Sequence, residues 1–493
     1  MSRVRGVLIV VLSVISLAGC GAGSDQKPAQ GSGSGQRSAQ RPAGEKVTIR
    51  VPANAPTIAA AVSVAQQGDL VLVAPGTYHE SVRITTPHVT LRGESRDKVI
   101  IDGQLQQPNG IVVTAPGVAV ENLTVRGNTQ NGVLVTGSVK AADGEPGDGG
   151  YDTGDEPVRF LESFLVSHVT ATRNGLYGIY AFSARNGVIE QSYASGGADS
   201  GIYVGQCKPC HMVVQDNVAE YNAVGIEGTN ASGEMYFVGN RIVGNRVGLT
   251  TGSDHQEKLL PQQGAVVAGN LIADNQQSAT PEQADGGWGV GVGIDGGSGN
   301  QIVHNRIAGN VNAGVILTAT QDLPPDNNRI QNNVFTGNAL DVGWTFPTAT
   351  KGHDNCLTGP TTRTIPTNLP TTAPCPALST PTSPPSTSPG APGSPSGAPA
   401  SPSGAAASPS GAAANPSASA SSGRAVSPSG AWKGPVPPRG IPFNQVVAPP
   451  VQPQYPAATT TGATTVPEAP ALPSLAQLTT PAPTLLADRA LAK

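Results

Sequence analysis

A repeat of short apolar steps, each opened by a glycine, runs through the middle of the chain. The glycines stand at positions 178, 201, 225 and 248, and their spacings are 23, 24 and 23 residues. A second pattern places two asparagines five residues apart in the repeats from Asn217 onward: Asn217/Asn222, Asn240/Asn245, Asn270/Asn275, Asn305/Asn310 and Asn333/Asn338. A period in the low twenties, with short β-type runs between Gly and Asn turns, is typical of a β-solenoid.

The repeat also predicts which way the side chains point. The apolar residue after each glycine should face the core, so the following residue should face outward on one sheet. This gives an outward row, in which Asp295 is included only when Gly293 is the repeat glycine, and the pattern leaves both Gly291 and Gly293 open for that role: Tyr180, Tyr203, Glu227, Thr250, Asp295 and Ile316. Stacked asparagines at a coil corner bond to each other and to the backbone, and we interpret them as structural.

The outward row offers candidate chemistry. Glu227 and Asp295 would lie two coils apart, about 9.6 Å at the backbone, close to the carboxyl spacing of an inverting glycosidase. Tyr180 and Tyr203 would form an aromatic shelf for a sugar ring. The alternative is that all of these are ordinary solvated residues.

Two further residues are candidates for substrate binding. Asp199 lies just before the strand of Tyr203 and is a candidate for sugar or metal binding, or simply for capping its own turn. Arg246 is expected near Glu227.

The two ends of the chain differ from the middle. Residues 1–20 have two arginines, an apolar run too short to span a bilayer, and Leu-Ala-Gly before Cys20. Residues 21–46 read as a flexible linker and 47–375 as the solenoid, which Ile58, Ala61 and Val62 would cap as a short helix. Residues 376–493 are rich in Pro, Ser, Ala and Thr and are expected to be disordered.

The net charge and the number of cysteines limit which partners and covalent links the protein is expected to have. The net charge is −4 and no basic stripe is present, which argues against nucleic acid as a partner. Four cysteines remain after Cys20, and in an exported protein their proximity favours the disulfides Cys207–Cys210 and Cys356–Cys375. Cys207–His211 also matches the haem c attachment pattern, and a Cys₂His metal site is a further alternative.

Other metal sites are weaker candidates. No metal is assigned to the solenoid, and the acidic residues of 143–156 are a candidate Ca²⁺ site or a mobile acidic loop.

Two resemblances extend this picture. Leu17–Cys20 resembles a bacterial lipobox, which implies cleavage before Cys20, a lipid on its sulfur, and an extracytoplasmic protein anchored to the cell membrane. The segments 199–206 and 224–227, with Pro75–Tyr78 after an apolar strand, resemble right-handed parallel β-helix repeat proteins of the pectate-lyase-like superfold. That resemblance covers about 47–350.

The fold class expected is therefore all-β: a right-handed parallel β-helix with an N-terminal capping helix and a disordered C-terminal tail. The resemblance implies an anchored protein that binds, and as an enzyme would hydrolyse, eliminate or otherwise modify, an extracellular polysaccharide. Two alternatives stay open, a non-enzymatic surface scaffold or adhesin and a metal-handling accessory protein, although seven His and three Met are few for the latter.

Overall fold

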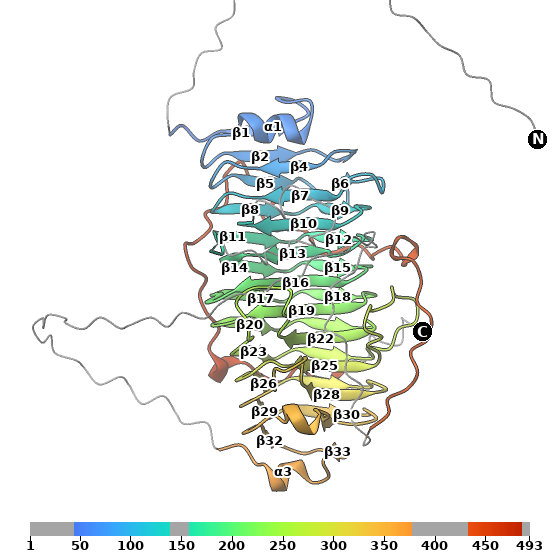
Figure 1. Ribbon diagram of the computed structural model, residues 1–493. Coiled ribbons are helices and arrows are strands. Elements are labelled where there is room, and N and C mark those ends of the chain that lie inside the picture. Colours follow the sequence, from blue (N-terminus) through green and yellow to red (C-terminus); the bar gives the residue numbers. More distant parts are fainter. Residues whose placement is uncertain (1–43, 139–156, 377–431, 486–493) are drawn as a thin grey trace, which may run out of the picture. The chain divides into compact units, whose positions relative to one another are not determined.

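The computed structural model describes residues 44–138, 157–376 and 432–485 (Figure 1). The chain winds through three parallel sheets of 12, 11 and 10 strands, and each strand pairs with its equivalent one coil away. The right-handed parallel β-helix expected from the repeat is confirmed. The described residues include no helix that is both long and apolar enough to cross a membrane.

Each complete coil contributes one strand to each sheet, whereas the first coil has only β1 in sheet A and the last has no strand in sheet B. Sheet A consists of β1 (Thr48–Val51), β2 (Leu70–Val73), β5 (Thr90–Gly93), β8 (Val118–Glu121), β11 (Leu161–Ser167), β14 (Ala184–Glu190), β17 (Met212–Gln215), β20 (Met235–Val238), β23 (Ala265–Ala268), β26 (Gln301–Val303), β29 (Arg329–Gln331) and β32 (Cys356–Thr358). Sheet B consists of β3 (Gly76–Tyr78), β6 (Val99–Asp102), β9 (Thr124–Arg126), β12 (Thr170–Thr172), β15 (Tyr193–Ser195), β18 (Val218–Glu220), β21 (Arg241–Val243), β24 (Leu271–Ala273), β27 (Arg306–Ala308) and β30 (Val334–Thr336). Sheet C consists of β4 (Val82–Ile84), β7 (Asn109–Val113), β10 (Asn131–Thr136), β13 (Ile179–Phe182), β16 (Ser200–Cys207), β19 (Val224–Ala231), β22 (Val247–Gly252), β25 (Val290–Asp295), β28 (Ala313–Thr318), β31 (Val342–Trp344) and β33 (Thr364–Ile365).

The core is a stack of aligned aliphatic side chains. The residues that follow the repeat glycines pair in register and are fully buried: Ile179, Ile202, Ile226, Leu249, Val292 and Val315. Their inward orientation was expected from the sequence and is confirmed, except that Val292 takes the place in the row that the expected register gave to Ile294. Removing such a continuous apolar row from water is the main favourable contribution to the stability of the coil stack.

Both ends of the solenoid are covered. Helix α1 (Ile58–Val64) is capped by the Thr57 side chain and buries Ile58, Ala61 and Val62 over the first coil, as predicted. At the other end, α3 (Leu369–Thr372) buries Leu369, and the Cys356–Cys375 disulfide ties this segment to β32. Short 3₁₀ turns are η1 (Thr348–Thr350), η2 (Phe443–Gln445) and η3 (Leu475–Gln477).

The asparagines form hydrogen-bonded ladders inside the coil corners. The Asn270 side-chain oxygen shows the pattern: it accepts from the backbone N–H and from the side-chain amide of Asn240, one coil earlier, and the Asn270 amide also donates to the Phe237 carbonyl. One ladder runs Asn217, Asn240, Asn270, Asn305 and Asn333, and the other runs Asn222, Asn245, Asn275, Asn310 and Asn338. A third ladder, which the repeat did not predict, joins Gln262, Asn300, Asn328 and Asn355. The structural interpretation of the asparagines is therefore confirmed.

The repeat glycines and the second ladder require one another. A Cβ on Gly201 would lie 2.7 Å from the Asn222 side-chain nitrogen and 2.7 Å from the Gly225 carbonyl oxygen. The same contact recurs at Gly225 with Asn245 and at Gly248 with Asn275. Any side chain at these positions would therefore break the ladder or push neighbouring coils apart.

Both expected disulfides are formed, Cys207–Cys210 and Cys356–Cys375. Because the sulfurs of Cys207 and Cys210 are bonded to each other, this segment offers no thiol for haem attachment and no thiolate for a Cys₂His site.

The expectation of disorder does not hold for residues 432–485, which we call the C-terminal strap. These residues lie against the solenoid, where Arg92 donates to Thr460 and Thr464 and Arg173 donates to the Val446 carbonyl. The segment was expected to lack enough apolar area to order itself. It is ordered instead by hydrogen bonds to side chains of the solenoid.

Replacing Asn270 by Ala should destabilise the protein by about 2–4 kcal/mol, because it strips the buried Phe237 carbonyl and Asn240 N–H of their partners. The measurement is the free energy of unfolding from urea titration. Asn444→Ala, at an exposed asparagine, is the matched control and should change it by less than about 0.5 kcal/mol.

Converting both Cys356 and Cys375 to Ser should lower the free energy of unfolding by about 3 kcal/mol, because the disulfide closes a loop of 19 residues in the unfolded chain. The Cys207→Ser/Cys210→Ser pair closes only a separation of 3 residues and should cost less. Equal losses in the two double variants, compared by thermal unfolding, would contradict the loop-closure argument.

Candidate functional site

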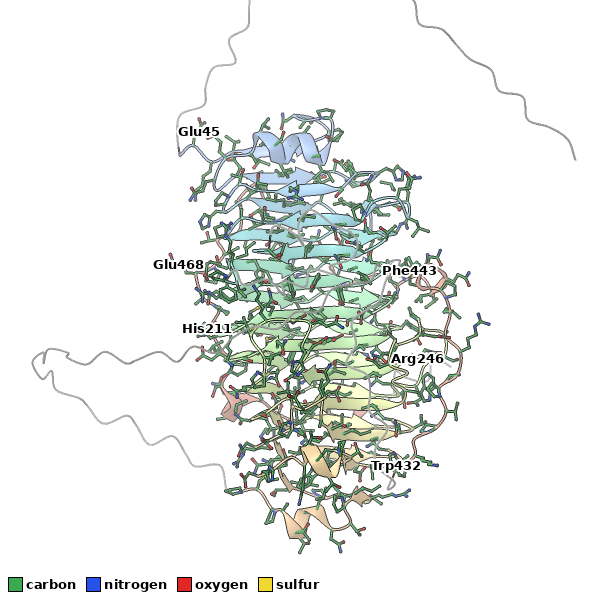
Figure 2. All side chains as sticks on the ribbon, viewed as in Figure 1. Glu45, His211, Arg246, Trp432, Phe443 and Glu468 are labelled. Atoms are coloured by element: carbon green, nitrogen blue, oxygen red, sulfur yellow. A yellow bond between two sulfur atoms is a disulfide. The ribbon has the colours of Figure 1, made fainter. Side chains whose placement is uncertain are left out.

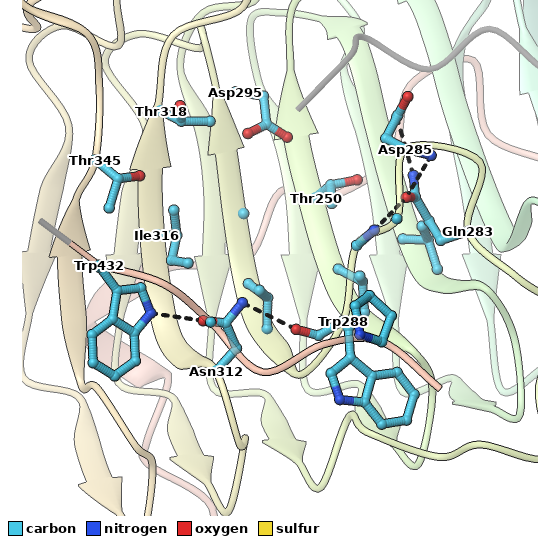
Figure 3. A pocket seen from close by; sticks show the side chains of 18 of the residues that line it. Thr250, Gln283, Asp285, Trp288, Asp295, Asn312, Ile316, Thr318, Thr345 and Trp432 are labelled. Atoms are coloured by element: carbon cyan, nitrogen blue, oxygen red, sulfur yellow. Dashed lines mark hydrogen bonds between the residues drawn. The ribbon is translucent and has the colours of Figure 1, made fainter. Parts of the chain in front are cut away.

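A groove with a volume of about 480 Å³ lies on the outer face of sheet C (Figure 3). Its floor is built from β22, β25 and β28 and from Thr345, which follows β31, and Thr250, Gly293 and Ile316 are among the lining residues. One wall is the insertion before β25, which contributes 283 and 285–288. The other wall is the start of the C-terminal strap, which contributes 432–435 and 437.

The register places Asp295 in a different row from the one expected. Glu227 pairs with Thr250, Thr250 pairs with Gly293, and Asp295 lies opposite Gly252 and Thr318. Gly291 is therefore the repeat glycine, and the prediction based on Gly293 was wrong. Asp295 still faces outward, but its backbone is about 12 Å from that of Glu227 rather than 9.6 Å, since it is displaced by two coils and two residues.

Tyr180 and Tyr203 do not form an exposed aromatic shelf. Tyr180 is 3% exposed and Tyr203 is 4% exposed, because Tyr177 packs on both, with ring centroids 4.4 and 4.7 Å away. The Tyr203 hydroxyl also donates to Glu257, which comes from the insertion after β22. The expectation of an exposed sugar platform was wrong because the insertion folds over the sheet.

Asp199 and Glu227 form a carboxyl pair beside the groove: Glu227 lies on β19, the strand next to β22 in sheet C, and neither residue is among those that line the groove. Burial, followed by the nearby charge of Asp285, raises the pKa of Asp199 to about 6, although a hydrogen bond from Tyr177 opposes this. Burial, followed by the charges of Asp199 and Asp254, raises the pKa of Glu227 to about 8. The hydroxyls of Ser200 and Thr229 donate to Glu227 and hold its two oxygens in place.

Asp295 is the carboxyl on the groove floor. It lies between Thr250 and Thr318 in the view of Figure 3, where Asp285 appears on the wall to one side. Burial, with a smaller contribution from the charge of Asp285, raises the pKa of Asp295 to about 7. Gln283 positions Asp285 by donating to its carboxylate and by accepting from its backbone N–H.

A further acid lies beneath the insertion. Glu257 is 3% exposed, and burial raises its pKa well above its usual range. One of its oxygens accepts from Tyr203, and the other has no hydrogen-bond partner among the described residues. The pKa of Tyr203 is also raised, by burial and then by the charge of Glu257. The hydrogen bond from Tyr203 to Glu257 therefore lies in a site closed to solvent.

Arg246 does not lie beside Glu227 as expected. Its guanidinium stacks on Trp288 at 4.9 Å and donates to the Pro438 carbonyl of the strap. Figure 2 shows Arg246 and Trp432 on the same side of the solenoid. Arg246 therefore supports the wall of the groove and does not balance the carboxyl pair.

Asn312 connects the two walls. Its side-chain oxygen accepts from the Trp432 indole N–H at 2.8 Å, and its amide donates to the Trp288 carbonyl at 3.1 Å (Figure 3). Arg363 stacks on Trp432, with its guanidinium carbon 4.7 Å from the ring. The groove therefore depends on a residue from the far end of the sequence.

The sequence prediction did not include Asp285, Trp288, Glu257 or Trp432. The first three lie in the insertion between Gly248 and Gly291, and that break in the repeat was the available signal. A tryptophan in a tail composed mainly of small residues and proline was the signal for the fourth.

No group of three or more His, Cys, Asp or Glu residues in 44–138, 157–376 and 432–485 is arranged to hold a metal ion. The candidate Ca²⁺ loop 143–156 lies outside the described residues.

No curated protein shows significant sequence similarity to the chain. Among solved structures, the chain is similar to the A-module of the mannuronan C-5 epimerase AlgE4 of Azotobacter vinelandii, at 15% identity and a TM-score of 0.37, over 60% of this chain and 90% of that one. It is also similar to tailspike protein 2 of the Escherichia coli O157:H7 bacteriophage CAB120, at 10% identity and a TM-score of 0.43, over 61% and 40% of the two chains. An alginate lyase from Paenibacillus matches at 14% identity and a TM-score of 0.30, over 62% and 97%.

A family model gives the assignment over the central coils. Residues 109–263 match the family described as "Right handed beta helix region". These residues span β7 to the end of the insertion after β22 and include Asp199, Glu227 and Glu257. The chain is thus a right-handed parallel β-helix protein.

Proposed function

We propose that the protein binds a polysaccharide along the groove on sheet C and modifies it by acid–base chemistry at Asp199 and Glu227. The observation that carries the proposal is the carboxyl pair itself, whose two pKa values are about 6 and about 8. Two neighbouring titratable groups with separated pKa values are the arrangement that supplies an acid and a base at the same pH.

The protonation states follow directly. Near pH 7 Asp199 is mostly ionised and can accept a proton, while Glu227 is mostly protonated and can donate one. Asp295, with a pKa of about 7, lies further along the same sheet in the groove floor. A glycan running along the groove across the strands of sheet C would contact Asp295 and extend toward the pair.

The charge of the site argues for the class of glycan. The groups whose charges act on Asp199, Glu227 and Asp295 are all carboxyls, including Asp254 and Asp285. A polyuronate would be repelled by this field, whereas a neutral or amino-sugar polymer would not. We therefore expect neutral or amino-sugar glycans to bind in preference to uronates.

The location of the protein in the cell is part of the proposal. The leader and Cys20 support a lipid-anchored protein facing outward from the cell membrane, where extracellular polysaccharide is accessible.

Replacing Glu227 by Gln should abolish turnover while changing glycan affinity less than about threefold, since the amide keeps the shape but transfers no proton. In the wild type, kcat/KM should be bell-shaped with flanks near the pKa values of about 6 and about 8. Reducing-sugar and unsaturated-product assays follow the reaction, and glycan arrays follow binding.

Glu220→Gln is the control, because Glu220 lies on β18 of sheet B, where it accepts from Tyr193. It should leave turnover unchanged. Turnover that survives Glu227→Gln would overturn the catalytic proposal. Glycan binding without turnover in the wild type would favour the non-enzymatic scaffold over the enzyme. If the wild type bound no glycan, polysaccharide would be wrong as the proposed ligand.

The raised pKa of Glu227 also predicts a pH-dependent stability that does not require a substrate. The folded state holds the Glu227 proton up to about pH 8, whereas the unfolded chain releases it near 4.5, so this group makes stability fall as pH rises between those values. Glu227→Gln removes that fall. Its melting temperature should exceed that of the wild type at pH 9 and match it at pH 4, and an equal difference at both pH values would contradict the assignment.

A further inference from the structure

The C-terminal strap follows a long path over the solenoid. Trp432 lies at Asn312 on the β28 side, Val446 lies at Arg173, and Thr461 meets Thr48 of β1. The chain then returns, so that the Pro481 carbonyl meets Arg306 of β27. In Figure 1 the strap appears as the red and orange trace along both sides of the coil stack.

A set of arginines, which we call the arginine lane, holds the strap. Each donates to at least one main-chain carbonyl of the strap: Arg92, Arg96, Arg173, Arg241, Arg246 and Arg306. The donor–acceptor distances are 2.7 Å at Arg173 and at Arg306 and 3.0 Å at Arg96. Apart from the bonds of Arg92 to the Thr460 and Thr464 hydroxyls, these contacts are made to backbone atoms, so they recognise an extended chain more than a particular side-chain sequence.

The surroundings of Arg92 show that the arginine lane binds the strap through buried, specific contacts. Arg92 and Glu121 are 2% and 0% exposed, and they are paired at 2.8 Å. Thr464 donates to the second Glu121 oxygen, and Thr460 and Thr464 accept from the Arg92 guanidinium. A charged pair this well shielded is costly unless its remaining hydrogen-bonding positions are filled, and the strap fills them.

Apolar contacts anchor the strap between the arginines. Val446 is fully buried, and a Cβ on Gly196 would lie 3.2 Å from the Val446 Cβ. Leu475 and Leu478 pack on a cluster that includes Val213 and Val266 of sheet A. Tyr455 lies under the Arg92 guanidinium at 5.2 Å. These contacts add affinity to backbone recognition.

The composition of the strap suits this mode of binding. Thirteen of its 54 residues are proline and only Lys433, Arg439 and Glu468 are charged. Proline has no N–H and favours an extended backbone whose carbonyls have no internal partners. The backbone at Pro442 and Leu478 has φ, ψ of −56°, 139° and −78°, 129°, which is the polyproline II region.

We propose that the arginine lane is a peptide-binding site for extended proline-rich chains, and that its occupant can be the 432–485 segment of a second copy of this protein. Residues 377–431 number 55, and a chain of that length spans at most about 180–200 Å. The 12 strands of sheet A stack over about 53 Å. The connection is therefore long enough for the strap of one copy to reach the lane of a neighbour anchored beside it.

The first experiment tests exchange in the intact protein. A protease recognition sequence placed between Gly404 and Ala405 of the full chain allows the strap to be cut free after folding. A fluorescent synthetic peptide of residues 432–485 is then added in excess and co-elution is measured by size exclusion. The peptide is expected to replace the cut strap. Arg173→Gln and Arg306→Gln should each weaken its binding about tenfold, as expected for loss of a charged hydrogen bond.

The control is Arg185→Gln, because Arg185 pairs with Glu162 on sheet A. It should change peptide affinity less than twofold. A cut strap that stays bound and never exchanges would overturn binding from a second copy, and a cut strap that leaves without the peptide binding would overturn the lane itself.

The second experiment tests the second copy directly. Full chains carrying two different tags are co-expressed and purified on one tag. Co-purification that is reduced in the Arg173→Gln/Arg306→Gln double variant is expected, and its absence in the wild type would overturn the exchanged assembly. Neither experiment involves a glycan, so the outcome is independent of the proposed function of the groove.

Discussion

The structure depends on the fit between a glycine on one strand and an asparagine in the adjoining corner. Neighbouring coils approach so closely that the Gly201 α-carbon faces the Gly225 carbonyl and the Asn222 amide with no room for a side chain. The amide in turn satisfies backbone groups that the corner would otherwise bury without partners. This combination sets the stacking of the coils, and the stacking sets which side chains share a row. The positions of the site residues are therefore consequences of corner hydrogen bonding.

Fixed stacking also explains the electrostatics. Parallel coils place like residues above one another at about 4.8 Å, so acids on neighbouring coils are held close whether or not they attract. The two loops inserted between Gly248 and Gly291, one after β22 and one before β25, then cover part of sheet C and withdraw those acids from water. This raises the pKa values of Glu227 and Asp295. The same covering buries Tyr203 and Glu257. Regular coils bring the groups together, and irregular loops change their chemistry.

The sequence predicted the regular part of the molecule well. The period located the coils, the inward row around Ile202 and Ile226, the cap at Ile58 and both disulfides, because each depends on local spacing. It failed where the period breaks. Gly291 and Gly293 differ by one alternation, so local pattern left both registers open for Asp295, and only the pairing with Gly252 decides between them. Arg246, the tyrosines and residues 432–485 were misplaced because contacts over long sequence separations determine their surroundings.

The strap changes how the coils of this solenoid are coupled to one another. In a simple repeat array each coil touches only its neighbours, so the ends can fray independently and stability is a sum of local terms. Here one continuous segment contacts Thr48 in the first coil and Asn312 near the last ones, which couples distant coils through a single chain. Loss of structure at one end then weakens the attachment at the other, so the array should melt as one cooperative unit. The same long-range closure raises the contact order, and folding should be slower than coil-by-coil growth would allow.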